Sequence, residues 1–146
     1  MGASNSFIQK LDIYLSFPEE NEFVIGLKRK LLDLNYSICD TSIVKKSLET
    51  LTTAEISKHM ETLIKNTRFI IICVSLKSLT SFTQSIEMNN LLDNSFQLTD
   101  KVIYLIMDEN YPCVLINKHM EKNDCFLYYD QETISESFEK IIEKLK

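Results

Sequence analysis

The chain lacks the glycines on which several large classes of nucleotide-binding enzyme depend. Among its 146 residues only Gly2 and Gly26 are glycine. A Walker loop or a Rossmann G-x-G-x-x-G turn needs several glycines, because each must bring backbone N–H groups close to phosphate. The sequence therefore excludes both kinds of phosphate-binding loop.

Paired cysteines and an excess of basic residues are also missing. Cys39, Cys73, Cys113 and Cys125 form no C-x-x-C pair, and Cys73 lies inside an apolar run. This spacing predicts neither a metal site nor a disulfide framework, and it favours a reducing compartment. Sixteen basic side chains against 21 acidic ones give a net charge of −5, which argues against nucleic acid as a partner.

No apolar run reaches the ~20 residues of a membrane span, and none has the form of a signal peptide. The first six residues fit the myristoylation pattern M-G-x-x-x-[ST], with Gly2 as the acceptor, although the match can also arise by chance. One myristoyl chain binds a membrane only weakly. We therefore expect a cytoplasmic protein that is peripheral at a membrane only if Gly2 is acylated.

The strongest feature that is present is the run Arg68–Ser75, which holds six consecutive apolar residues. It does not alternate between apolar and polar residues, and it is too short to span a membrane. Such a run is typical of a strand covered on both faces in a parallel sheet. With 146 residues and 45% hydrophobic content, we expect one domain over residues 11–146, preceded by an extension over residues 1–10.

Strands and helices alternate around this central strand. Further strands are expected at Leu11–Phe17, Tyr36–Cys39, Lys101–Met107 and Cys125–Tyr129, and helices at Glu19–Leu34, Thr52–Ile64, Ser81–Leu92 and Thr133–Leu145. Capping boxes are predicted at Thr52–Glu55 and Ser81–Gln84, and Thr133–Glu136 is expected to cap the last helix. The segment Asp40–Leu51 has no clear period, so we expect a long loop with a functional role. The alternation predicts an α/β fold of the flavodoxin-like type: a doubly wound, five-stranded parallel sheet of order 2-1-3-4-5 with helices on both faces.

In a sheet of this order, ligands bind in the crevice between the first and third strands, at their carboxyl ends. Ser16 and Phe17 end the first strand, Ser75 follows the third, and Glu87 lies on the next helix. Glu87 also has a plain interpretation as an exposed helical carboxylate. In either case we expect Glu87→Gln to leave the stability almost unchanged, as a surface substitution usually does.

From Leu11 to Leu145 the chain resembles the Toll/interleukin-1 receptor (TIR) domain family. The matching residues are Asp12–Phe17 at the family's first box, Asn35–Ile38, Lys65–Ser75 at its third strand, and Ser81 six positions before Glu87. The last spacing is similar to the family's S-x-W-C-x-x-E segment. The chain departs from that pattern because it has no Trp, and Thr83 and Gln84 stand where Trp and Cys would be.

The resemblance implies an intracellular signalling module, in innate-immune or cell-death-like signalling, that binds other TIR domains as a homo-oligomer or through an adaptor. The segment Asp40–Leu51 would make the contact, through Asp40, Lys45, Lys46 and Leu48.

The alternative that the resemblance implies is an NAD+ nucleosidase activated by assembly, with NAD+ as substrate and without a bound cofactor or metal. Glu87 would be its catalytic carboxylate, because one carboxylate can hold the ribose hydroxyls and favour the developing positive charge. The residues expected to contact NAD+ are Ser16, Phe17, Ser75, Phe82 and Thr83. Pro18-Glu19-Glu20 opposes this alternative, since acidic groups there would repel a pyrophosphate.

Overall fold

The computed structural model describes residues 11–93, 101–108 and 124–146. The expected acylation site Gly2 and the extension over residues 1–10 lie outside these ranges. The described elements are β1 (Leu11–Ser16), α2 (Glu22–Asp33), β2 (Ile38–Asp40), α3 (Thr41–Ser47), α4 (Thr53–Asn66), β3 (Thr67–Val74), η1 (Leu76–Leu79), α5 (Phe82–Asp93), β4 (Val102–Ile106), β5 (Asp124–Leu127) and α8 (Gln131–Leu145).

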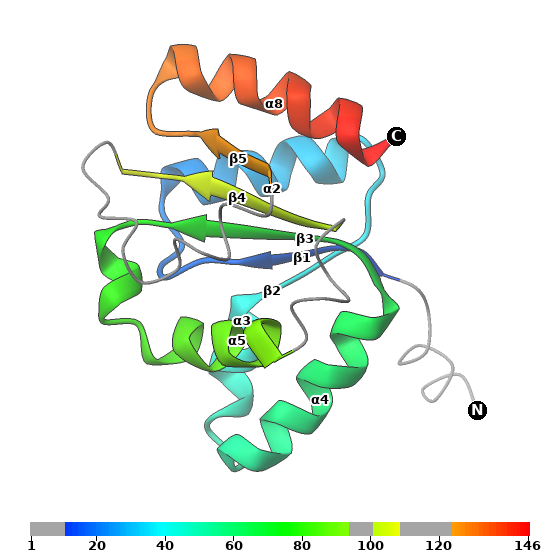
Figure 1. Ribbon diagram of the computed structural model, residues 1–146, viewed down its shortest axis with the longest axis vertical. Helices are drawn as coiled ribbons and strands as arrows, with labels where there is room; N and C mark the ends of the chain where they lie inside the picture. Colours follow the sequence, from blue (N-terminus) through cyan, green and yellow to red (C-terminus); the bar gives the residue numbers. More distant parts are fainter. Residues whose placement is uncertain (1–10, 94–100, 109–123) are drawn as a thin grey trace.

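The five strands form one sheet in which every neighbouring pair is parallel (Figure 1). Their order is β2-β1-β3-β4-β5, which confirms the predicted flavodoxin-like topology. The central strand β3 carries the apolar run, and Ile70, Ile71 and Ile72 are fully buried. Successive side chains of a strand point to opposite faces, so this run can be buried only if both faces are covered.

Two helical layers provide that cover (Figure 1). Helices α2 and α8 pack on one face of the sheet, and α3, α4 and α5 pack on the other. Strand β1 divides its side chains between the layers: Tyr14 belongs to the core under α3, α4 and α5, whereas Ile13 and Leu15 belong to the core under α2 and α8. In the part of the chain that the structure describes, no helix has the length and apolar character needed to cross a membrane.

Local sequence accounts for most helix ends. Helix α2 ends where Asn35 adopts a left-handed conformation with φ 68°, which asparagine tolerates better than most residues. Helix α4 begins at the predicted capping box, in which Thr52 and Glu55 exchange hydrogen bonds. For α8 the predicted cap is wrong: the N-cap is Asp130, whose carboxylate accepts the Thr133 N–H at 2.8 Å.

The expectation of a long loop from Asp40 to Leu51 is also wrong, because Thr41–Ser47 forms the helix α3. Asp40 ends β2 and caps this helix, and its carboxylate accepts the Ser42 N–H at 2.9 Å. Helix α3 has seven residues and buries only Thr41 and Val44. Two buried positions are too few to produce a recognisable helical period, which explains why the sequence pattern did not reveal it.

Candidate functional site

The centre of the candidate site is Glu87 of α5, which is fully buried with 0% of its surface exposed. Gln84 and Glu87 are three residues apart on this helix, so both face the carboxyl end of β1. The interpretation of Glu87 as an exposed carboxylate is therefore wrong. A buried charge needs hydrogen-bonding partners, because leaving it unpaired is costly.

Two of these partners come from β1. The Tyr14 hydroxyl donates a short hydrogen bond to Oε2 of Glu87, and the Ser16 hydroxyl lies 3.0 Å from Oε1. Tyr14 and Ser16 are two residues apart in a strand, so their side chains point to the same face. Strand β1 thus presents two hydroxyl groups to one carboxylate.

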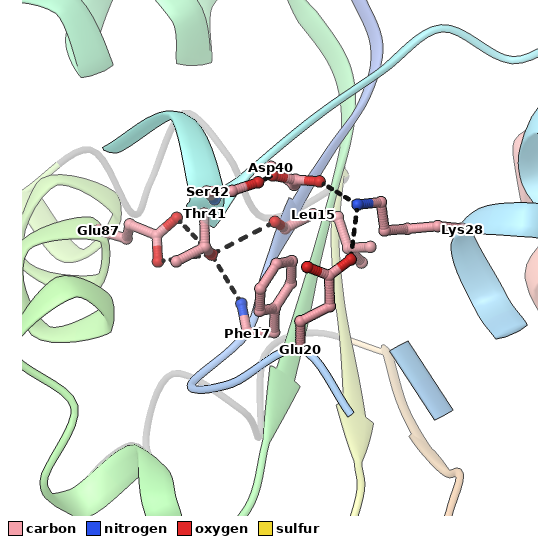
Figure 2. A network of polar contacts seen from close by, with 8 residues as sticks. All are labelled: Leu15, Phe17, Glu20, Lys28, Asp40, Thr41, Ser42 and Glu87. Atoms are coloured by element: carbon pink, nitrogen blue, oxygen red, sulfur yellow. Dashed lines mark hydrogen bonds and ion pairs between the residues drawn. The ribbon is translucent and has the colours of Figure 1, made fainter. Parts of the chain in front are cut away.

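The third partner is Thr41, the first residue of α3 (Figure 2). Its hydroxyl lies 3.0 Å from Oε1 and 2.9 Å from Oε2 of Glu87. The same oxygen accepts the backbone N–H of Phe17 at 2.9 Å. Thr41 therefore connects the end of β1, the start of α3 and the middle of α5.

Burial raises the pKa of Glu87 to about 7, even though the hydrogen bonds from Tyr14, Thr41 and Ser16 favour the ionised form. The negative charge of Asp40 adds to the rise. Burial and the proximity of Glu87 hold the pKa of Tyr14 well above its ordinary value. The phenol therefore keeps its proton, while the carboxyl group changes charge near neutral pH.

Gln84 extends this polar cluster towards β3. Its Nε2 donates to the Cys73 carbonyl oxygen at 2.8 Å and to the Ser16 hydroxyl at 3.3 Å. The predicted capping box at Ser81 is half formed: the Ser81 hydroxyl accepts the Gln84 N–H at 3.1 Å, but the Gln84 side chain turns into the protein. Its Oε1 is buried and has no hydrogen-bond partner among the described residues.

A second polar cluster holds the other side of the α3 N-terminus. Lys28 of α2 lies 2.7 Å from Asp40 and 3.1 Å from Glu20 (Figure 2). Burial alone would raise the pKa of Asp40, but hydrogen bonds from Lys28 and Ser42 outweigh it and keep that pKa below its ordinary value. Asp40 and Thr41 are adjacent, so α2 and α5 together fix the first turn of α3.

The structure brings together only part of the predicted NAD+ site. Ser16 and Glu87 are in contact, whereas the Phe17 ring packs in the apolar core under α2 and α8 and only its N–H reaches the cluster. Ser75 caps η1 through the Lys77 N–H at 3.2 Å. Phe82 is 63% exposed and Thr83 is half-buried.

The predicted interaction residues divide in a similar way. Lys45 and Lys46 are exposed, whereas Leu48 is half-buried and Asp40 is 7% exposed. Asp40 is thus a capping and ion-pairing residue, and it presents little surface to a partner.

Sequence reasoning missed Tyr14, Thr41 and Gln84. The sequence does contain a signal for Tyr14. It lies two residues before the polar Ser16 in a mostly apolar strand, and side chains two residues apart point to the same face of a sheet. No comparable signal existed for Thr41, whose position depends on a helix that the sequence pattern did not predict.

Among the described residues, no group of His, Cys, Asp and Glu side chains could hold a metal ion. Comparisons of the chain with protein-family models, with curated proteins and with solved structures find no match.

Proposed function

We propose that this chain is an interaction module of the TIR type that acts by self-association, with α3 of one copy binding α8 of the next. The observation that carries the proposal is a pair of oppositely charged, exposed surfaces on opposite sides of the molecule. The basic surface consists of Ile43, Lys45 and Lys46. The acidic row consists of Glu132, Glu136, Glu139 and Glu143.

The basic surface combines charge with apolar area. Ile43 is 53% exposed, and neither Lys45 nor Lys46 has an ion pair with another described residue. Leu76, Leu79 and Phe82 are also exposed. They follow β3, and α3 follows β2, so both segments begin at the carboxyl ends of parallel strands. Exposed apolar side chains at one end of a sheet often mark a site of protein association.

The acidic row lies along one side of α8, because its residues are spaced at i, i+4, i+7 and i+11. All four carboxylates are exposed, and none has an ion pair with another described residue. This row is complementary in charge to Lys45 and Lys46. Complementary charges steer and orient two partners, and apolar contact then adds affinity.

Helices α3 and α8 lie on opposite faces of the sheet (Figure 1). A contact between them joins different surfaces of two copies and leaves one α3 and one α8 unoccupied at the ends. Such a heterologous contact allows further copies to add. The proposal therefore implies assembly that continues with rising protein concentration.

A charge-swap experiment tests this proposal. Lys45→Glu/Lys46→Glu should abolish concentration-dependent sedimentation, and so should Glu136→Lys/Glu139→Lys. Mixing the two variants should restore it, because the acidic α3 of one then meets the basic α8 of the other. Lys58→Glu/Lys65→Glu on α4 has the same change in charge as the first variant and should assemble like wild type.

A wild-type protein that stays monomeric at every accessible concentration would contradict the proposed self-association. The same holds if the two charge variants assemble as well alone as in the mixture.

NAD+ cleavage is the second candidate function. It is favoured by a carboxyl group with a pKa near neutrality beside β1 and β3, where ligands bind in sheets of this order. Glu87 is fully buried, so this candidate requires an opening that admits substrate, and we propose that the first turn of α3 moves to provide it.

Incubation of concentrated protein with NAD+, followed by measurement of free nicotinamide, tests this candidate. Glu87→Gln should reduce the release by about 10²- to 10³-fold, because it removes the negative charge that stabilises the oxocarbenium-like state. No release from assembled wild type, or equal release from Glu87→Gln, would exclude the assignment.

A further inference from the structure

We propose that Glu87 and Thr41 form a proton-controlled latch on α3: a protonated Glu87 keeps the first turn of the helix in place, and an ionised Glu87 releases it. The effect of the latch on assembly rests on the proposed function, because α3 carries the basic surface. The latch itself depends only on contacts between α3, α5 and β1.

The geometry singles out α3 as the part that can move. Of the described groups that contact the Glu87 carboxylate, Tyr14 and Ser16 belong to β1, which is paired on both sides within the sheet. Thr41 belongs to a helix of seven residues that buries one other side chain, Val44. Elements with few buried contacts open at the lowest free-energy cost. Movement of Thr41 is therefore the easiest way for water to reach Glu87.

The sign of the effect follows from proton linkage. In the closed arrangement burial raises the pKa of Glu87 to about 7, whereas a hydrated carboxyl group has a pKa near 4.5. The closed arrangement thus binds the proton more tightly and is favoured at low pH. Between these two pKa values the ratio of open to closed rises by up to about tenfold for each pH unit, and above about 7 it stays constant.

The other titratable groups that lie against Glu87 keep their protonation state between about pH 4.5 and about pH 7. Burial raises the pKa values of Tyr14 and Cys73 well above ordinary, and it raises that of Cys39 to about 11. Asp40 stays ionised because Lys28 lies 2.7 Å away. The Lys, Glu and His side chains of α3 and α4 are all exposed: Lys45, Lys46, Glu55, Lys58, His59, Glu61 and Lys65. Glu87 is therefore the buried group in this cluster that changes charge near neutral pH.

Hydrogen exchange on the full chain, kept dilute so that it is monomeric, tests the latch. Protection factors of the α3 amides, corrected for intrinsic exchange, should fall by up to about tenfold per pH unit from about pH 5.5 to 7 and then level off. Amides of α8 serve as the internal reference. Glu87→Gln, an uncharged isostere, should give an α3 protection that does not depend on pH, whereas His59→Gln should follow wild type.

Tyr14→Phe gives a graded second test that leaves Glu87 in place. It removes a hydrogen bond that favours the ionised carboxylate, so the transition should move to higher pH. A wild-type α3 whose protection does not depend on pH would overturn the latch. So would a Glu87→Gln variant with the wild-type slope, or a Tyr14→Phe variant with an unmoved midpoint.

The latch and the proposed function can fail separately. We expect wild-type assembly to weaken from about pH 5.5 to about pH 7 and then to stay constant, and Glu87→Gln assembly not to depend on pH. If α3 protection follows the expected profile in a chain that never assembles, the latch stands and the proposed function fails. If the charge swap restores assembly while α3 protection stays flat, the proposed function stands and the latch fails.

Discussion

The hydroxyl oxygen of Thr41 lies 2.9 Å and 3.0 Å from the two carboxylate oxygens of Glu87, although the residues are 46 positions apart. This contact joins the first residue of α3 to the middle of α5 at the carboxyl end of β1. The position of α3 therefore depends on a buried acid.

Glu87→Gln should become more stabilising as the pH rises. The pKa of Glu87 in the folded state, about 7, lies above its ordinary value of 4.5. The stability that wild type gains from the bound proton is therefore fully present below about pH 4.5, and it is lost as the pH rises through about 7. At ~1.4 kcal/mol per pH unit, the difference in unfolding free energy between variant and wild type should change by about 3 kcal/mol. Urea unfolding at about pH 5, 6, 7 and 8 measures this change, and a constant difference would contradict it.

Thr41→Val should destabilise the protein by about 1–3 kcal/mol, because the Phe17 N–H and the Glu87 carboxylate each lose a buried partner. Chemical denaturation at neutral pH measures the loss. Thr62→Val is the matched control, since Thr62 is exposed on α4 and should change the stability by less than ~0.5 kcal/mol. Equal effects at the two positions would mean that the Thr41 hydroxyl has no structural role.

Lys28→Met should destabilise the protein more than Asp40→Asn does. The methionine leaves the nearly buried Asp40 carboxylate without its cation, whereas asparagine removes the charge and still caps α3. We expect about 1–3 kcal/mol for Lys28→Met, between the values for exposed and buried ion pairs. The double variant should lose little beyond Asp40→Asn, and additive losses would argue against coupling.

The Asp40 pair should also have a pH dependence opposite to that of Glu87. The pKa of Asp40 is lowered in the folded state, so the stability it contributes is present above its ordinary value of 3.8 and is lost as the pH falls through the lower, folded-state pKa. The penalty of Lys28→Met should thus shrink under acidic conditions. Thermal unfolding from about pH 3 to about pH 7 checks this trend.

Asp130→Ala should lower the free energy of unfolding, because it removes the N-cap of α8. Glu132→Ala, in the first turn of the same helix, should cost less because its side chain is exposed and does not cap the helix. Urea titration of the two variants separates these effects. A larger loss for Glu132→Ala would place the helix start elsewhere.

The sequence by itself determined the parallel sheet and its order. The unbroken apolar run of β3 requires cover on both faces, and the alternation with amphipathic helices then leaves few topologies. The capping box at Thr52 likewise fixed the start of α4, because a cap depends on residues three positions apart. It also identified Ser16 and Glu87 as neighbours, since strand order decides which carboxyl ends lie side by side.

Only the tertiary structure decided the burial of Glu87 and the existence of α3. A glutamate has the same local pattern whether its helix side faces water or a sheet, so its burial and raised pKa appear only when β1 and α3 close over it. Helix α3 is too short for a clear period and is held by Lys28 and Glu87, which lie far from it in the sequence. Contacts between distant residues carry no local signal, and for that reason the fold was predictable while the place of Thr41 in the polar cluster was not.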